Sequence, residues 1–239
     1  LVFFLFLSQV LFAQNQKTFL TEIHNNKKEN LIKVALDDNY PPYIFKDSKG
    51  NIQGILVDLW QLFEKRTGIK VKLLAMNWNK AMEAINTGQA DVIDTIFYNE
   101  KRTMIYDFTR PYVKIEVPVF FNQNINGIHN IESLRGYSIG VKSGDACIEV
   151  LKSNGITSLV EFKSYEEIIK AASENKIRVF SIDKPPALYY LYKFGMDENF
   201  KYSLNLYTGA FHRAVKKGND SLLKTLEDGF GLITQQEML

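Results

Sequence analysis

The sequence has little of several features that mark particular classes of protein. Its single cysteine, Cys147, excludes an intramolecular disulfide. Lys and Arg number 29 against 27 Asp and Glu, and no polybasic run stands out, so the charge pattern does not favour nucleic-acid binding. The chain also lacks the run of about 20 apolar residues that a transmembrane helix needs. Its 239 residues, 46% hydrophobic and 23% charged, predict a globular protein of one large or two small domains.

Catalytic and metal-binding patterns are missing as well. His24, His129 and His212 do not stand at metal-ligand spacing from another His, a Cys or paired acids. No nucleophile elbow, phosphate-binding loop or dinucleotide fingerprint occurs. Cys147 has no histidine near it in sequence and is expected to be an inert, small apolar residue. We therefore expect no catalytic residue, no metal ion and no cofactor.

The N-terminal segment predicts export. Residues 1–13 are apolar except for Ser8 and Gln9, as in the central region of a secretory signal whose basic start is missing. Cleavage after Ala13 is one expectation, and retention as a membrane anchor is the alternative. The polar residues 14–30 are expected to form a linker. The predicted location is periplasmic or otherwise extracytoplasmic.

Beyond the linker, strand and helix patterns alternate in two sets, and each set predicts a mostly parallel sheet flanked by helices. Gly68 and Gly88 end two helices of the first set, and Gly155 ends one of the second. The predicted strands are 31–36, 70–75 and 92–97, then 137–141, 158–162 and 177–182; the predicted helices are 54–68 and 80–87, then 146–153, 165–175 and 187–194.

Two further segments connect these sets. The apolar run 114–122 lies between them, and a strand pattern at 207–215 follows the second set, ahead of an amphipathic helix at 221–233. One strand out and one strand back predict two lobes, the first made from both ends of the chain. The predicted boundaries are 31–116 with 206–239 for lobe 1, and 117–205 for lobe 2.

Chemistry suited to a small zwitterion follows several of the predicted strands, where open α/β sheets bind ligands. Arg102 offers bidentate geometry for a carboxylate, and the turn at 142–145 offers backbone N–H groups to an anion. Asp183 supplies an acid for an ammonium group, and Tyr40 and Trp78 supply aromatic faces. Each residue alone also fits an ordinary structural role, so the prediction depends on their joint placement at strand ends.

An ordered series of motifs then gives the chain a family resemblance. From about Leu31 to Ile233 it resembles the polar amino-acid family of bacterial type II periplasmic solute-binding proteins, the third bacterial solute-binding family. The motifs that carry the resemblance are Tyr40-Pro41-Pro42-Tyr43, Asp47 to Gly50, Gly54 to Asp58, Trp78 with Ile85, Gly88 and Asp91, Glu100-Lys101-Arg102, Asp107 to Tyr112, and Ser133 to Gly144.

The resemblance implies a two-lobed fold with hinge strands near 117–121 and 205–211, and a ligand site between the lobes. It implies Arg102 as the partner of a ligand carboxylate and Asp183 as the partner of a ligand ammonium group. Gly144 and Asp145 match the anion-binding turn of the second lobe. The full set of implied ligand-binding residues is Asp37, Tyr40, Trp78, Thr95, Phe97, Arg102, Gly144, Asp145 and Asp183.

Two departures from the family pattern leave the ligand open. The loop Asp94–Asn99 is one residue shorter than the family's carboxylate-binding loop, and Asp145 stands where a Thr or Ser hydroxyl is common. A carboxylate there repels a ligand carboxylate unless it caps the helix or pairs with Arg102. An amino acid is the leading expectation, with an amine, a peptide-like solute or another small metabolite as alternatives.

The expected function is capture of a small solute by hinge closure. The expected partners are the ligand and either an ABC permease or, in a sensor, the protein's own transmembrane and cytoplasmic output domains. The alternative is an enzyme on the same scaffold, such as a dehydratase, which would use Glu100, Asp145 or Asp183 as general acid or base.

Overall fold

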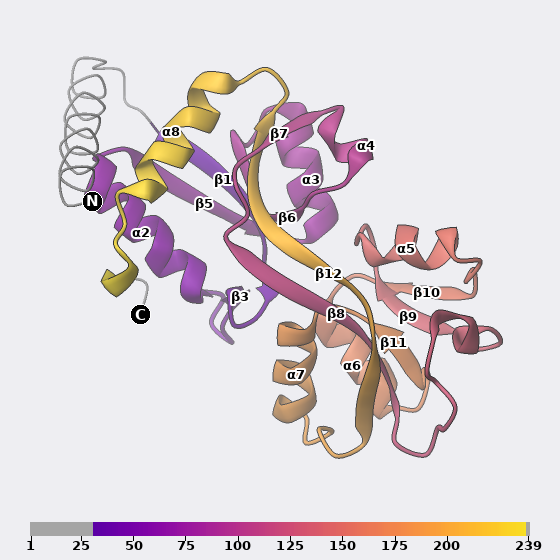
Figure 1. Cartoon of the computed structure of the whole chain (residues 1–239). Coiled ribbons are helices and arrows are strands. Elements are labelled where there is room, and N and C mark those ends of the chain that lie inside the picture. The colour runs from indigo at the N-terminus through magenta and orange to yellow at the C-terminus, as the bar shows by residue number, and fades with distance from the viewer. Residues whose placement is uncertain (1–30, 238–239) are drawn as a thin grey trace, which may run out of the picture.

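The structure is a computed structural model that describes residues 31–237; the predicted signal segment and linker lie outside these residues. Figure 1 shows two lobes joined by two long strands, β8 (Val113–Asn122) and β12 (Phe200–Lys216). Every parallel strand pair lies within one lobe, and these two strands are antiparallel to each other.

Lobe 1 is built from both ends of the described chain. Its helices lie around the sheet formed by β5, β1 and β6, with β12 next to β6. Its elements are β1 (Leu31–Asp37), β2 (Asn39–Tyr40), β3 (Ile44–Lys46), β4 (Ile52–Gln53), α2 (Ile55–Thr67), β5 (Lys70–Met76), α3 (Trp78–Thr87), β6 (Val92–Phe97), α4 (Glu100–Thr103), β7 (Tyr106–Phe108), α8 (Asp220–Gly231) and the 3-10 turn η2 (Gln235–Glu237).

Lobe 2 is the middle of the chain. Its strand order is β10, β9, β11, followed by β8, so the sheets of the two lobes are continuous through the pair β8 and β12. The lobe contains η1 (Ile131–Leu134), β9 (Ile139–Lys142), α5 (Cys147–Ser153), β10 (Leu159–Phe162), α6 (Tyr165–Ser173), β11 (Val179–Ser181) and α7 (Lys184–Lys193).

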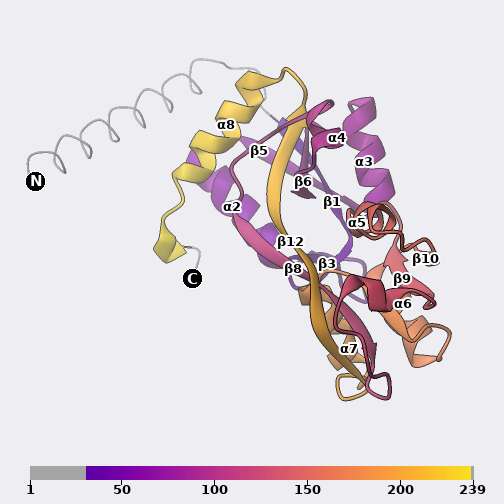
Figure 2. The same cartoon turned by 45° about the vertical axis from the view of Figure 1, so that its right-hand side comes forward.

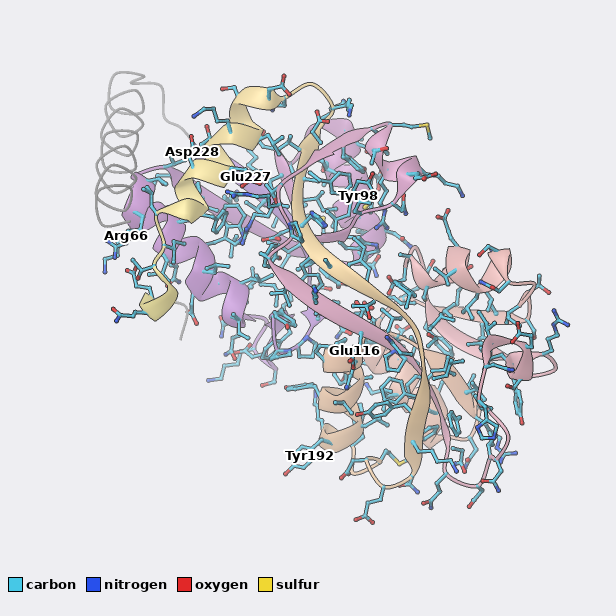
Figure 3. The ribbon with its side chains drawn as sticks, viewed as in Figure 1. Arg66, Tyr98, Glu116, Tyr192, Glu227 and Asp228 are labelled. Carbon is cyan, nitrogen blue, oxygen red and sulfur yellow. The ribbon has the colours of Figure 1, made fainter. Side chains whose placement is uncertain are left out.

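The strands that connect the lobes pair along most of their length, from Phe200 opposite Asn122 to Phe211 opposite Val113. The ladder is irregular between Tyr202 and Leu204 and again between Asn205 and Tyr207. Glu116 of β8 lies between the two lobes (Figure 3), and the Lys184 Nζ of α7 is 2.5 Å from its carboxylate. The two irregular places in the β8–β12 ladder bend the strands locally, which suits a segment about which two lobes rotate.

The start of α7 corrects a sequence prediction. The helix begins at Lys184, not at Ala187, with Pro185 and Pro186 inside its first turn. Proline is tolerated there because the first N–H groups of a helix have no intrahelical partner. The residue before the helix, Asp183, makes no side-chain capping bond. A capping carboxylate accepts from the second or third N–H of the helix, and both positions here are prolines, so Asp183 remains available for other contacts.

Other differences concern segments with weak patterns. The short α4 and β7 were not predicted, and β12 is longer than the expected strand at 207–215. β11 is confined to three residues of the expected 177–182. The long elements are close to their expected bounds. Among residues 31–237, no helix is both long and apolar enough to cross a membrane.

The start of α2 requires a glycine, which gives a first prediction. Gly54 has φ 120° and ψ 169°, and a Cβ there would lie 2.8 Å from the Pro42 carbonyl oxygen and 2.6 Å from the Tyr43 carbonyl carbon. Gly54→Ala is expected to lower the free energy of unfolding by about 3 kcal/mol, because both the backbone conformation and the contact are unfavourable. Urea unfolding measures the loss.

The matched control is Gly50→Ala. Gly50 also has a positive φ, 83°, but nothing lies within 4 Å of the Cβ position. The control is expected to lose only the conformational cost, about 1–2 kcal/mol. Equal losses in both variants would show that the contact with residues 42 and 43 has no energetic role.

Candidate functional site

Ends of strands from both lobes meet at one cleft. Asp37 ends β1 and Thr95 lies near the end of β6, while Lys142 ends β9 and Asp183 follows β11. These ends surround a small cavity between the lobes. The lining residues are Asp37, Tyr40, Trp78, Thr95, Phe97, Arg102, Lys142, Asp145, Tyr165 and Asp183.

A buried ion pair crosses the cleft. The Lys142 ammonium of lobe 2 pairs with the Asp37 carboxylate of lobe 1, and both side chains are 2% exposed. The Lys142 Nζ also lies 4.1 Å from the centroid of the Tyr165 ring. Burial lowers the pKa of Lys142 to about 8, while the carboxylates of Asp145 and Asp183 act in the opposite direction. The pair ties the two lobes together directly.

Asp183 is the most unusual acid in the cleft. It is 3% exposed, and its Oδ2 accepts a 2.5 Å hydrogen bond from the Tyr40 hydroxyl of lobe 1. The Tyr165 hydroxyl lies 3.3 Å from the same oxygen. The other oxygen, Oδ1, is buried without a hydrogen-bond partner among the described residues. Burial, and next the charge of Asp145, raise the pKa of Asp183 to about 8.

The turn before α5 carries a second acid. Asp145 Oδ1 accepts from its neighbour, the Ala146 N–H, at 2.8 Å, and Oδ2 accepts from the Tyr165 hydroxyl at 3.1 Å. Gly144 has φ 76°, and its carbonyl accepts a 3.2 Å bond from the Trp78 indole. In Figure 2 the starts of α5 and α3 lie side by side at this contact. The turn therefore belongs to the contact between the lobes.

Arg102 is positioned by its own helix. The Asn99 side chain caps α4 by accepting from the Arg102 N–H at 2.8 Å, and the Arg102 Nη1 donates to the Phe97 carbonyl at 2.8 Å. The guanidinium carbon lies 6.0 Å from the Trp78 ring centroid. Burial lowers the pKa of Arg102, and the charge of Asp145 opposes this shift more than any other group. Asp145 of the other lobe lines the same cavity as Arg102.

A buried network holds Thr95 beneath the cleft. Thr95 has φ 61°, which is uncommon for a β-branched residue. The buried carboxylate of Asp94 accepts from the Thr95 N–H at 2.7 Å, from the Trp60 indole at 2.8 Å and from the Tyr112 hydroxyl at 2.6 Å. The Arg213 Nε lies 3.4 Å from the same carboxylate. This network fixes the backbone where β6 reaches the site.

Further hydrogen bonds join the lobes around the cleft. Asn39 donates to the Tyr190 hydroxyl at 2.6 Å, and Asn79 donates to the Ser143 hydroxyl at 3.2 Å. At the rim, the Lys101 Nζ lies 2.6 Å from the Glu149 carboxylate. The structure is therefore a closed arrangement, with direct contacts between the lobes on more than one side of the cavity.

The structure brings most of the expected site residues together. Eight of the nine line the cavity, and Gly144 is the ninth, which contacts Trp78 through its carbonyl. The side chains of Lys142 and Tyr165 were not expected at the site. Lys142 was considered only for the backbone of its turn. Tyr165 follows Ser164, whose side chain caps α6. The position of Tyr165 at the start of a helix was the sequence signal that could have indicated it.

Cys147 and His212, which the sequence analysis considered, do not line the cavity. Cys147 is fully buried, and burial raises the pKa of its thiol well above the usual value. The ring of His212 contacts the Thr109 carbonyl, away from the cavity. His24 lies outside the described residues. Among the described residues, no group of three or more His, Cys, Asp and Glu is arranged to hold a metal ion.

Comparisons with known proteins agree with this architecture. The L-cystine-binding protein TcyJ of Escherichia coli (strain K12) is 25% identical over 224 residues, covering 89% of this chain and 81% of TcyJ. A crystallised histidine kinase sensor domain with similarity to periplasmic binding proteins matches with TM-score 0.81 at 22% identity, covering 87% of this chain and 91% of that one.

An ancestral arginine-binding protein bound to glutamine matches with TM-score 0.76 at 24% identity, covering 85% of this chain and 92% of that one. These two structures confirm the predicted two-lobed α/β periplasmic-binding-protein fold. The family model described as bacterial extracellular solute-binding proteins, family 3, matches residues 32–239.

Proposed function

The chain belongs to family 3 of the bacterial extracellular solute-binding proteins, and from this membership we propose that its cleft captures an amino acid or a related amine. Closure of the two lobes about β8 and β12 encloses the ligand. The proposed location is the periplasm or another extracytoplasmic compartment, as the family description implies. The nine residues expected from the sequence are proposed as ligand contacts, together with Lys142 and Tyr165.

One observation supports this proposal above the others. Asp183 Oδ1 is buried and without a hydrogen-bond partner among the described residues, and Asp183 lines the cavity between the lobes. A buried acceptor without a donor is costly, so a ligand that donates there gains affinity. An ammonium group supplies such a donor and also a compensating charge.

The closed cleft also fits a binding protein better than an enzyme. Each acid considered for catalysis has an evident other role: Asp145 contacts Tyr165, Asp183 contacts Tyr40, and Glu100 is an exposed residue of the first turn of α4. We therefore propose binding without turnover. Mass spectrometry of each bound compound after prolonged incubation tests this, and recovery of a chemically altered ligand would contradict it.

We consider two kinds of partner for the proposed receptor, a transport permease and linked signalling domains. TcyJ is by its name a binding protein for L-cystine, and uptake through an ABC permease is one proposal for this chain. The likeness to a kinase sensor domain favours the other, signalling through linked transmembrane and output domains. A transmembrane helix encoded downstream of residue 239 would identify the sensor. A stop codon within about 20 codons of residue 239, too few for a membrane span, would identify the transport receptor.

The binding proposal predicts how two variants behave. Asp183→Ala is expected to abolish the thermal stabilisation caused by any amino acid or amine that stabilises the unaltered protein, and Arg102→Ala that caused by any ligand with a carboxylate. Each removes an ionisable group of the cleft, and neither is part of the buried ion pair of Asp37 with Lys142. A thermal-shift screen of amino acids and amines measures the effect. An unchanged ligand response in both variants would refute the proposed site.

A further inference from the structure

The charges that line the cleft do not balance. Three carboxylates line the cavity, those of Asp37, Asp145 and Asp183, with two cations, Lys142 and Arg102. Lys142 pairs directly with Asp37 and also attracts Asp183. The cavity is therefore one positive charge short, and Asp183 has a buried oxygen without a hydrogen-bond partner among the described residues.

Asp183 also lacks a hydrogen-bond donor for one of its oxygens. The Tyr165 hydroxyl lies 3.1 Å from Asp145 Oδ2 and 3.3 Å from Asp183 Oδ2, and its single proton can serve only one of them at a time. The Tyr40 hydroxyl serves Asp183 Oδ2. Nothing among the described residues donates to Asp183 Oδ1. Burial and the charge of Asp145 raise the pKa of Asp183, as expected of an acid that lacks a compensating cation.

The surroundings of Arg102 disfavour a ligand carboxylate. One guanidinium nitrogen is committed to the Phe97 carbonyl, and Asp145 of the facing turn lines the same cavity as Arg102. A carboxylate approaching Arg102 would be brought near the like charge of Asp145 in a largely buried site. Juxtaposed like charges of this kind weaken binding about tenfold or more, a loss that a neutral group does not incur.

The rest of the cavity suits an apolar body. Tyr40, Trp78, Phe97 and Tyr165 are each no more than 8% exposed, and all four line the space beside Asp183. Aromatic faces attract ammonium ions and pack against hydrocarbon. The cavity between the closed lobes is small, which limits the ligand to a small molecule.

We infer that the ligand of this cleft is a small organic ammonium ion without a carboxylate, held by Asp183 among these aromatic rings. The inference rests on the proposed function and narrows it from amino acids and amines to amines. In it the ammonium group donates to Asp183 Oδ1 and supplies the third positive charge, which balances the three carboxylates of the cleft.

The test compares amines with the amino acids from which they differ only by the carboxylate. Titration calorimetry of the full protein with phenethylamine against phenylalanine, histamine against histidine, isoamylamine against leucine, and putrescine against ornithine measures each pair. Among pairs that bind, the amine is expected to bind about tenfold more tightly or better. Equal or tighter binding of the amino acid would overturn this inference and leave the proposed function standing. Failure of every compound to bind folded protein would overturn both.

A variant of Asp145 tests the same inference by changing the protein and not the ligand. Asp145→Asn keeps the side-chain shape but removes the charge opposite Arg102, so it is expected to lower the preference for the amine about tenfold within each pair. Asp58→Asn is the matched control, since Asp58 is exposed on α2 and does not line the cavity. An unchanged preference in Asp145→Asn, with binding retained, would overturn the role assigned to Asp145 and with it the exclusion of carboxylates.

Discussion

Lys142→Met is expected to lower the free energy of unfolding by about 3–5 kcal/mol, the range for removing one partner of a buried ion pair. The variant leaves the Asp37 carboxylate 2% exposed and without its cation. Asp37 Oδ1 keeps the hydrogen bond from the Asn39 N–H at 3.0 Å, but Oδ2, the oxygen that pairs with Lys142, is left without a partner among the described residues. Methionine fills a similar volume, so the loss reports the charge more than a cavity.

Two further variants test whether the loss of stability comes from the buried ion pair. The double variant Asp37→Asn with Lys142→Met is expected to recover more than half of the lost stability, because no unpaired charge remains. Lys184→Met removes an ammonium that pairs with Glu116, an exposed site where the expected loss is below about 1 kcal/mol. Denaturant unfolding of these three variants and of Asp37→Asn alone measures the differences. Strict additivity of the two single losses would show that the pair contributes no coupling between the lobes.

Asp183→Asn is expected to stabilise the ligand-free protein increasingly as the pH rises. The folded-state pKa of Asp183 is raised from 3.8 to about 8, so between these values the folded protein holds a proton that the unfolded chain has released. Raising the pH through this window therefore lowers the stability of the unaltered protein. The slope is about 1.4 kcal/mol per pH unit, or about 4 kcal/mol between pH 5 and pH 8. Asparagine does not titrate and removes that slope.

Unfolding in urea at several pH values between 5 and 8 measures the difference between the variant and the unaltered protein. The groups facing Asp183 are Tyr40, Tyr165, Asp145 and Lys142, and all four are retained. Asp58→Asn, which removes an exposed carboxylate, tests whether the slope requires the buried one. A pH-independent difference between Asp183→Asn and the unaltered protein would contradict the raised pKa.

Much of the fold follows from local signals in the sequence. Gly68 and Gly88 end α2 and α3 in the left-handed conformation, as their positions after amphipathic runs indicated. The start of α7 lies three residues before the predicted 187, because two prolines in a row, at 185 and 186, fit the end of a loop as well as the first turn of a helix. The short β7 pairs only with β12, a partner more than 100 residues away, and no local pattern could indicate it.

The candidate site was predictable where chemistry coincides with a strand end, as at Asp37 and Asp183. The role of Lys142 was not, because a lysine at the end of a strand is most often exposed, and its burial depends on a carboxylate from the other lobe. The network that holds Thr95 could not be predicted for a similar reason. It depends on Trp60 and Arg213, which are distant in sequence and meet only in the folded core.

The burial of Cys147 has a practical consequence for following closure in solution. Its Sγ lies inside lobe 2, 3.6 Å from the Ser181 carbonyl, and its thiol stays protonated at neutral pH because burial raises its pKa well above the usual value. A thiol-reactive dye will therefore not label the native fold. A cysteine introduced at the rim, in place of Glu149, becomes the single reactive thiol, opposite Lys101 across the cleft. Fluorescence from a dye attached there reports lobe separation directly, so the protein is suited to conversion into a sensor for its own ligand.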